Sequence, residues 1–427
     1  MHELTELIRL DMKPALGVTE PGAIAFCVAK AKSYVKGELT SVHVAMNSGM
    51  YKNAFTCGIP NSREVGNVFS AALGAVAGNA EKGLEALADV TEEDNLTARA
   101  MVDAGKVTVS MSGISSRIFI EATVKTAGDT AVVTIRDSHT NITKIIVNGV
   151  TVLETEDEHR AVAAAEAEAP LIHRYTLVEL IDYIETVPLA EIAFIREAYT
   201  VNMVLFEEAL RSERCGFAKR LLTLNGGKVF SDNEEATASL LCNAAIEARV
   251  LGLDKPAMSI TGSGAHGIIA TLPLYAAHKV SGHTEEQLLR ATALSYLICM
   301  YIKEYSGRLS AFCGCAIAAG SGMACALAWL RGGKAAELTH VLYNMASSIT
   351  GMICDGGNQG CTMKGVAAVA TAYRSVDFAL HGVYIASVHG INGKTAEQTM
   401  RNMGRIASPG MVETEGTIVA ICEEKLQ

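Results

Sequence analysis

Aromatic side chains are scarce in this sequence of 427 residues, at 5% of the chain with a single tryptophan. The hydrophobic fraction is nevertheless 49%, so the apolar content consists mainly of alanine, valine, isoleucine, leucine and methionine. Side chains of this kind suit closely packed helices. The length predicts two or three folding units with a large core, and the composition excludes disorder over most of the chain.

Basic residues are also in the minority, with 36 Lys and Arg against 46 Asp and Glu. No stripe rich in Lys and Arg stands out, and we therefore expect no nucleic-acid partner. Residues 1–17 lack an apolar run behind a positive region, which predicts no secretory signal and a cytoplasmic protein. In that reducing compartment the eleven cysteines are not expected to form a disulfide framework, and some of them are candidates for metal binding.

One uncharged run is a candidate for a membrane span. Segment 309–330 carries no charge and is long enough to cross a bilayer. It is dominated by Ala, Gly, Ser and Cys, however, whose insertion into lipid is marginal. We therefore expect a buried central helix at this segment and no membrane partner.

The pattern of residues changes character along the chain. Residues 2–34 favour two helices, and from about residue 175 onward the sequence is helical in period. Short turns such as Gly128-Asp129 between the later strands predict a mainly antiparallel sheet. Stretches rich in β-branched residues predict strands at 42–46, 107–111, 117–125, 130–136 and 141–147.

We therefore predict an α+β fold, in which a mostly helical catalytic domain carries an inserted α/β domain with a mainly antiparallel sheet. The helical domain is discontinuous and comprises residues 1–35 and 170–427, and the insert comprises residues 36–155. The acidic, alanine-rich stretch 156–169 between them is expected to be a linker or a solvated helix.

Cysteines in the last third of the chain form the strongest chemical signal. Cys313 and Cys315 precede the uncharged helix, and Cys354 and Cys361 enclose a loop that contains three glycines. Glycines allow thiolates to approach one ion or cluster closely. The spacing matches neither a zinc ribbon nor a ferredoxin, and buried core cysteines are an equally weighted alternative.

Polar residues gather in three further turns, at 47–53, 137–141 and 261–267. Backbone N–H groups exposed at glycines can form an anion nest, and His266 or Lys52 could complete a carboxylate site. Each turn alone is more typical of an ordinary capped turn, but three together favour a functional site. Neither His-Glu-x-x-His nor Gly-x-Ser-x-Gly is present, so common hydrolase chemistry has no support.

Together and in this order, the motifs resemble a known family, the L-cysteine desulfidase (UPF0597) proteins, which are relatives of the iron–sulfur L-serine dehydratase alpha chain. The resemblance runs from about residue 14 to the C-terminus and implies a PLP-independent β-elimination, in which L-cysteine yields pyruvate, ammonia and sulfide. It rests on Gly17-Val18-Thr19-Glu20-Pro21, Tyr51-Lys52-Asn53, Ser138-His139-Thr140-Asn141-Ile142, Gly262-Ser263-Gly264-Ala265-His266-Gly267, Cys313-Gly314-Cys315 and the loop from Cys354 to Cys361.

The resemblance also implies a [4Fe–4S] cluster held by three cysteines, with the fourth iron open to the substrate as a Lewis acid. By position, Cys354 and Cys361 match two of these ligands. Either Cys313 or Cys315 matches the third, and the sequence does not decide between them.

The same resemblance supplies the other site residues. The catalytic candidates are His266, Lys52 and Glu20, one of which would take the α-proton. We expect a small amino acid substrate to be bound by Asn47, Ser48, Asn53, His139, Thr140, Asn141 and Ser263.

Val18 departs from the family pattern Gly-Cys-Thr-Glu-Pro. Valine has no lone pair and no proton to give in place of that cysteine, which is considered a fourth cluster ligand or a catalytic group. A carbon–sulfur or carbon–oxygen lyase is the leading hypothesis, with a serine dehydratase-like activity or a non-catalytic small-molecule-binding relative as alternatives. We also expect a homodimer, because long uncharged helices bury further apolar surface by self-association.

Overall fold

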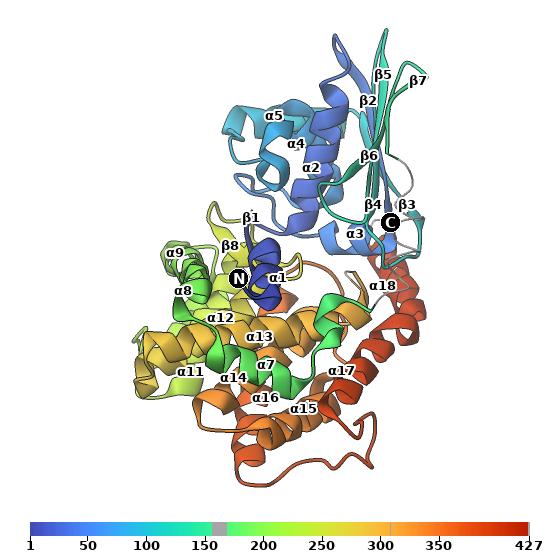
Figure 1. Cartoon of the computed structure of the whole chain (residues 1–427). Coiled ribbons are helices and arrows are strands. Elements are labelled where there is room, and N and C mark those ends of the chain that lie inside the picture. Colours follow the sequence, from blue (N-terminus) through green and yellow to red (C-terminus); the bar gives the residue numbers. More distant parts are fainter. Residues whose placement is uncertain (156–168, 308, 426–427) are drawn as a thin grey trace.

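The computed structural model describes residues 1–155, 169–307 and 309–425. A sheet with three helices on one face stands above a larger assembly of helices (Figure 1). This arrangement confirms the predicted α+β class. The expected acidic linker at 156–169 lies, apart from its last residue, outside the described residues.

A six-stranded sheet in the order β3-β2-β4-β5-β6-β7 forms the smaller part. Strands β2 and β3 pair in parallel and every other pair is antiparallel, as the short turns predict. Val42, Val44 and Met46 of β2 point into the core, as their alternation with less buried neighbours requires. The strands are β2 (Leu39–Asn47), β3 (Val107–Gly113), β4 (Phe119–Thr126), β5 (Thr130–Arg136), β6 (Ile142–Val147) and β7 (Val150–Glu154).

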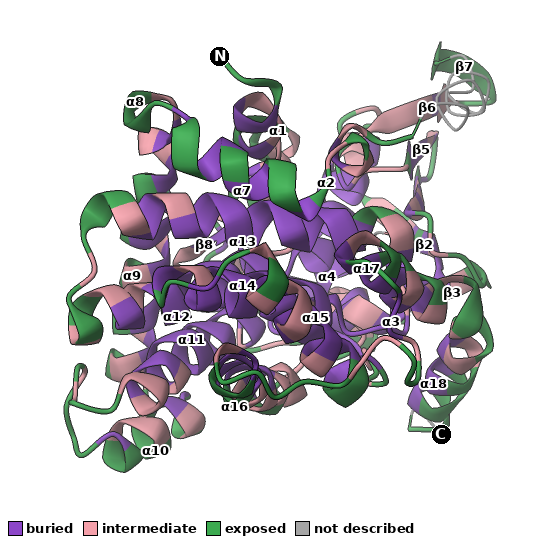
Figure 2. Cartoon of the chain, turned by 60° about the horizontal axis from the view of Figure 1, so that its bottom comes forward, coloured by how far each residue is buried: buried purple, intermediate pink, exposed green. Residues whose placement is uncertain are grey.

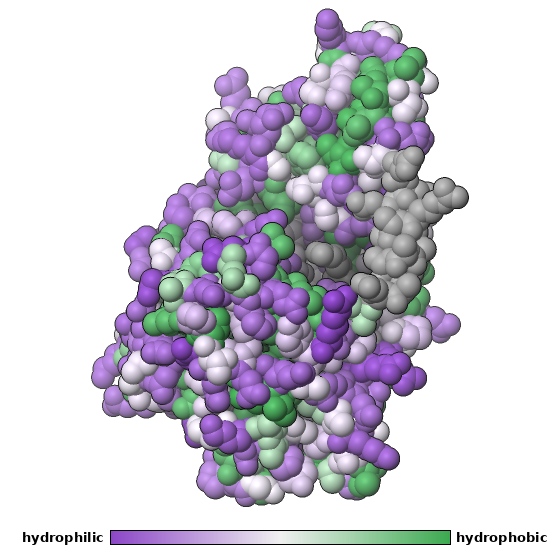
Figure 3. All heavy atoms as spheres, viewed as in Figure 1, coloured by the Kyte–Doolittle hydropathy of each residue, from purple (hydrophilic) through white to green (hydrophobic). Residues whose placement is uncertain are grey.

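Helices α2 (Thr19–Lys32), α4 (Gly66–Val76) and α5 (Glu92–Asp103) lie on one face of the sheet (Figure 1). Helix α2 contacts β4 and β5 and packs closely on α4, where a Cβ on Gly74 would come within 2.7 Å of the Ala25 backbone. The predicted boundary at residue 35 stays a prediction, but α2 has its main contacts on the sheet side. Figure 3 shows hydrophobic side chains on the surface over the sheet. Val150 and Val152 of β7 are exposed.

The helical part surrounds a buried centre of α12, α13 and α14, which Figure 2 shows as almost continuously buried. Its elements are α1 (Glu3–Asp11), α7 (Leu177–Thr186), α8 (Leu189–Ile192), α9 (Arg196–Arg211), α10 (Gly216–Leu224), α11 (Glu234–Val250), α12 (Gly264–Ser281), α13 (Glu285–Ser306), α14 (Gly320–Leu330), α15 (Ala335–Ile349), α16 (Gly360–Leu380), α17 (Ala396–Arg405) and α18 (Val412–Glu424).

The uncharged segment forms a π-helical turn (Cys315–Ala319) that continues into α14 (Gly320–Leu330), whereas residues 309–313 are not helical and the expected helix is shorter than predicted. Nearly all of its residues are buried inside the helical part, as predicted. Across the described residues, none of the helices combines the length and apolar character needed to cross a bilayer.

A two-stranded antiparallel ribbon places the site residues of the first and last parts of the chain together. It pairs β1 (Lys13–Leu16) with β8 (Pro256–Ser259). The start of α2 follows the Leu16 end of the ribbon and the turn before α12 follows the Ser259 end, so the two loops leave from opposite ends of this four-residue pairing. At the other side of the site, α18 packs on α3 (Ser48–Ala54) beneath the sheet.

Candidate functional site

Two loops that carry cysteines are joined by backbone hydrogen bonds. The Cys313 N–H donates to Met352 O at 3.0 Å, and the Cys354 N–H donates to Ala311 O at 2.6 Å. An isolated antiparallel β-bridge joins Phe312 of the first loop to Ile353 of the second. Cys313 and Cys354 are thereby held on neighbouring strands of backbone, although 40 residues of chain separate them.

Cys361, in the first turn of α16, lies near enough to Cys313 and Cys354 for their charges to act on its pKa. Burial raises the pKa of Cys361 to about 11, and the charges of Cys354 and Cys313 act in the same direction. Burial alone would lower the pKa of Lys364, but its hydrogen bond to Asp355 and the charges of Cys361, Cys354 and Cys313 raise it. Three thiols therefore lie around one ammonium group.

Cys315 lies next to Cys313 and also near two further buried thiols. Its charge acts on the pKa of the buried Cys242 and Cys299, whose ordinary values are raised mainly by burial. Its side chain also hydrogen-bonds with Cys313, which is the first cause of the raised pKa of Cys313. Of the two cysteines that the sequence left undecided, Cys313 is the one grouped with Cys354 and Cys361.

No three His, Cys, Asp or Glu side chains in the described part of the chain are placed to share one metal ion. A four-iron cluster makes a different demand, because each thiolate binds a different iron. Cys313, Cys354 and Cys361 would therefore each bind a separate iron of such a cluster and need not converge on one ion.

The loop between Cys354 and Cys361 rests on residues from the first part of the chain. The Gly357 N–H donates to Asn53 O at 2.9 Å, and a Cβ on Gly356 would come within 2.6 Å of Lys52 O. Gly356 has a φ of +116°, a conformation that favours glycine. Close approach of the two backbones explains why glycines occupy this loop.

Lys52 holds the same loop through hydrogen bonds to backbone carbonyl groups. Its ammonium group donates to Cys354 O at 2.7 Å and Ser310 O at 3.1 Å, and forms a buried ion pair with Glu415 of α18 at 2.9 Å. Burial alone would lower the pKa of Lys52, but the charges of Cys354 and Glu415 outweigh it and raise the pKa. A lysine held protonated by three partners suits a positioning role better than that of a base.

Glu20 lies buried at the start of α2 as a carboxylate. It accepts hydrogen bonds from Asn53 Nδ2 at 2.8 Å and Thr19 Oγ1 at 3.0 Å. Burial would raise its pKa, but the charge of His139, the hydrogen bond from Asn53 and the charge of Arg249 together lower it. Glu20 is thus an anion that faces residues from three separate segments.

His266 occupies the first turn of α12 as a neutral imidazole. Burial and the nearby cations Lys303 and Arg249 hold its pKa well below the usual value. The Thr261 hydroxyl donates to Ile260 O, and Oγ1 lies 2.5 Å from His266 Nδ1. Because that hydroxyl has one proton, Nδ1 must be the donor, which leaves a lone pair on Nε2.

His266 Nε2 lies close to the cysteine loop. A Cβ on Gly314, between Cys313 and Cys315, would come within 2.7 Å of His266 Nε2 and 3.1 Å of Lys303 Cδ. The neutral nitrogen therefore lies next to the segment that carries the proposed cluster ligand. A neutral imidazole near pH 7 is suited to act as a general base.

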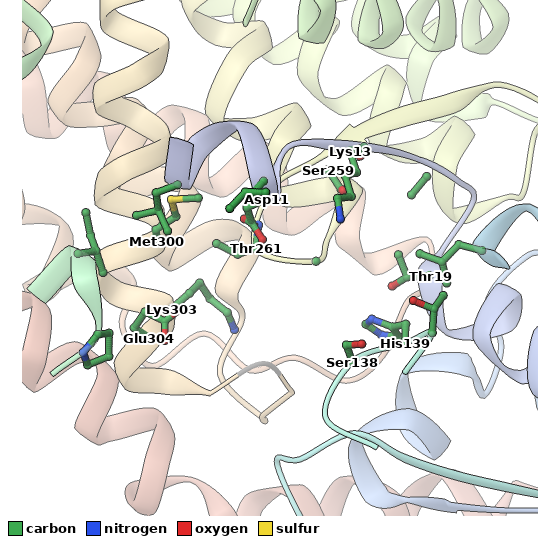
Figure 4. A pocket seen from close by; sticks show the side chains of 18 of the residues that line it. Asp11, Lys13, Thr19, Ser138, His139, Ser259, Thr261, Met300, Lys303 and Glu304 are labelled. Carbon is green, nitrogen blue, oxygen red and sulfur yellow. The ribbon is translucent and has the colours of Figure 1, made fainter. Parts of the chain in front are cut away.

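A cavity of about 520 Å³ opens beside these residues, between the ribbon, α13 and the loop before β6. Figure 4 shows Ser138 and His139 next to Thr19 on one side, and Lys303 on the other. Thr261, the partner of His266, also lines it. The cavity is large enough for a small amino acid.

Only some of the other predicted substrate-binding residues line the cavity. His139 and Thr140 line the cavity, and Ser263 directly precedes α12. Substrate binding by all of them stays a prediction. Three bond to the backbone of nearby loops instead of pointing into the cavity: Asn47 to Ser115 O and the Phe119 N–H, Ser48 to the Ser115 N–H, and Asn141 to Arg136 O.

Sequence reasoning missed Lys303, Arg249 and Lys364. Lys303 and Arg249 are both buried, at 7% and 4% exposure. Lys303 directly follows the apolar run 296–302 of α13, and this placement was the available signal for it. The burial of Arg249 depends on packing between distant segments and leaves no pattern in the sequence.

Over residues 81–420 the sequence matches the family described as serine dehydratase alpha chain. A UPF0597 protein of Clostridium botulinum (strain Langeland) is 38% identical over 424 residues, which cover 99% of this chain and 98% of the relative. A UPF0597 protein of Caldanaerobacter subterraneus subsp. tengcongensis is 36% identical over 423 residues, with 99% and 98% covered. The corresponding protein of Clostridioides difficile (strain 630) is 32% identical over 423 residues, with 98% and 99% covered.

These matches extend over nearly the whole length of both partners, and they confirm the resemblance seen in the ordered motifs. The chain belongs to the UPF0597 family, which is related to the serine dehydratase alpha chain.

Proposed function

We propose that this protein is a PLP-independent iron–sulfur lyase that eliminates the β-substituent of a small amino acid, with L-cysteine as substrate and pyruvate, ammonia and sulfide as products. The observation that carries the proposal is the backbone pairing that sets Cys313 beside Cys354, with the neutral His266 close to the adjacent Gly314. A cytoplasmic location and a homodimer are further parts of the proposal.

The donor set fits a [4Fe–4S] cluster. Cys313, Cys354 and Cys361 all act on the ammonium group of Lys364, and a cation in this position favours the thiolate forms that bind iron. Cys354 and Cys361 are partly exposed, so the site has access to solvent. When bound, a cluster with one open iron would supply a Lewis acid for the leaving thiol.

Proton transfer is assigned to His266. Its Nε2 accepts the proton from Cα of L-cysteine, and the electrons of that bond form the Cα–Cβ double bond while the Cβ–S bond breaks and sulfide leaves. The aminoacrylate that results is hydrolysed to pyruvate and ammonia. Thr261 fixes the imidazole in the tautomer that this step requires.

The remaining site residues bind the substrate or hold the cysteine loop in position. Glu20 stays ionised and suits the substrate's ammonium group, and His139 and Thr140 face the cavity through which the substrate would enter. Lys52 holds the Cys354 loop in place and does not exchange protons in this scheme.

Val18 favours a second candidate, a relative that binds the amino acid without converting it. Valine offers no ligand and no proton at a position that borders the cysteine loop. L-Serine is an alternative substrate for the first candidate, because loss of its hydroxyl group would follow the same steps.

Iron and acid-labile sulfide should be measured in anaerobically purified protein, together with pyruvate release from L-cysteine and L-serine. The lyase predicts about four iron and four sulfide per chain, the [4Fe–4S] stoichiometry, with pyruvate formed faster from L-cysteine. A cluster without turnover of either amino acid would favour the non-catalytic relative. Protein without iron would exclude the iron–sulfur lyase.

A further inference from the structure

Arg249 is a buried cation whose side chain forms no hydrogen bond or ion pair with any described residue. It lies at the end of α11 and is 4% exposed, and its Nε is without a hydrogen-bond partner. Glu20, Cys57 and His266 are near enough to interact with its charge. Burial of a guanidinium group costs free energy unless its donors are satisfied, so the arrangement requires an acceptor.

The N-terminus of α12 lies directly against this guanidinium group. A Cβ on Gly264, the first residue of this 18-residue helix, would come within 2.7 Å of Arg249 Nε. The preceding residue, Ser263, makes no side-chain cap. The first N–H groups of a helix have no acceptor within the helix and carry a partial positive charge.

Two sets of donors therefore converge, and both favour an anion. Arginine presents a planar fork that matches a carboxylate, and a helix N-terminus binds the same group through its N–H donors. Thr261 and Gly262, which lead into α12, line the cavity of about 520 Å³. A small anion can thus approach this end of the helix from the cavity.

We propose that Arg249 and the N-terminus of α12 bind the α-carboxylate of the amino acid substrate. This assignment rests on the proposed function, because it identifies the substrate's carboxylate as the missing acceptor. It also accounts for the position of His266 in the first turn of the same helix. A carboxylate held at Gly264 leaves Cα one bond away, next to the base that would take its proton.

Binding of pyruvate and of pyruvamide to anaerobically purified protein tests the proposal by calorimetry without any turnover. Both molecules have the same size, but only pyruvate has a carboxylate. We expect pyruvate to bind at least about 10-fold more tightly than pyruvamide, and more tightly than inorganic phosphate. Equal affinity for the acid and the amide, or tighter binding of phosphate, would overturn the assignment.

Three variants identify the residue responsible. Arg249→Met should weaken pyruvate binding by about 10- to 100-fold, and Arg249→Lys by less, because lysine keeps the charge but not the fork. Gly264→Ala, which retains Arg249, should also weaken binding because its Cβ displaces the guanidinium group. Arg211→Met, which changes an exposed arginine on α9, serves as the control and should bind pyruvate like the parent protein.

Failure of this inference can be distinguished from failure of the proposed function. Pyruvate release from L-cysteine with an unchanged KM in Arg249→Met would refute the carboxylate site and leave the lyase intact. Arg249-dependent binding of pyruvate in a protein that converts neither L-cysteine nor L-serine would support the site and refute the lyase. Unchanged pyruvate binding in both Arg249→Lys and Gly264→Ala would also refute the site, even if Arg249→Met does not fold.

Discussion

Val18 packs against Gly357, so that a Cβ on residue 357 would come within 2.9 Å of Val18 Cγ1. Val18 is 2% exposed and directly precedes α2, whereas Gly357 lies in the middle of the loop between Cys354 and Cys361. The position at which the family pattern has a cysteine therefore borders the proposed cluster loop in space as well. An apolar side chain there closes one side of the loop without offering a ligand.

Replacement of Val18 by cysteine should add a thiol at this border. We expect Val18→Cys to retain its iron longer than the parent protein during exposure to air, because a further thiolate can protect an open iron. Iron content against time of exposure measures this. Val18→Thr, which has nearly the same shape but no thiol, is the matched control. Equal rates of iron loss in all three proteins would contradict the prediction.

Replacement of Cys313 and replacement of Cys315 are expected to have very different effects on the iron content of the protein. Cys313→Ser should lower the iron content strongly, since Cys313 is grouped with Cys354 and Cys361 around Lys364. Cys315→Ser should retain most of the iron, because Cys315 also lies near Cys242 and Cys299. Iron and sulfide analysis of both variants decides the question. The opposite result would transfer the ligand role to Cys315.

Stability toward acid should depend on His266. Its pKa is lowered in the folded protein by burial and by Lys303 and Arg249, so below about pH 6.5 only the unfolded chain takes up this proton. This group therefore reduces stability by up to about 1.4 kcal/mol for each pH unit, until the lower folded pKa is reached. The reduction is absent in His266→Gln. Urea unfolding between about pH 7.5 and 5.5 should show the two proteins converging as pH falls, and parallel curves would contradict the prediction.

The Lys52–Glu415 ion pair should be important for stability because both side chains are buried. Lys52→Met leaves the carboxylate uncompensated and is expected to lower the free energy of unfolding by about 3–5 kcal/mol. Lys52→Met combined with Glu415→Met should recover part of that loss. Lys82→Met removes an exposed pair with Asp89 and should cost at most about 1 kcal/mol. Urea unfolding of the four proteins measures these differences, and equal effects at Lys52 and Lys82 would refute a structural role for the buried pair.

Local patterns predicted the sheet well where one face of a strand is buried. Strand β5 begins and ends at the predicted residues, 130 and 136, because β-branched residues favour a strand and the alternate positions 131, 133 and 135 are buried in the core. Every residue of β7 is exposed, so neither face of this strand is buried, and the strand was not predicted. The β1–β8 ribbon was missed for another reason, since it joins residues about 240 positions apart and each strand has only four residues.

The same distinction applies to the candidate site. The Cys354–Cys361 loop was found because its cysteines and glycines stand close together in the sequence. Arg249 and Lys303 were missed, because their burial arises only when α11, α12 and α13 pack together. The preference for Cys313 over Cys315 as the proposed ligand rests on the backbone pairing of two distant loops, which leaves no pattern in the sequence.

Gly314 is expected to be essential for the position of the base. Its backbone is ordinary, with φ near −55°, so alanine is allowed there by conformation. The added methyl group would nevertheless come within 2.7 Å of His266 Nε2 and 3.1 Å of Lys303 Cδ, and both side chains would have to move.

A displacement of about 1 Å at a catalytic group can lower turnover about 100-fold, and we expect a loss of this size in Gly314→Ala, with little change in iron content. Gly320→Ala is the control from the adjoining helix, because its nearest contact would be an ordinary 3.6 Å from Ala368 Cβ. That variant should keep its activity and gain up to about 1 kcal/mol of stability from the lower entropy of its unfolded chain. Pyruvate release from L-cysteine and urea unfolding measure both effects, and full activity in Gly314→Ala would remove His266 from the role of base.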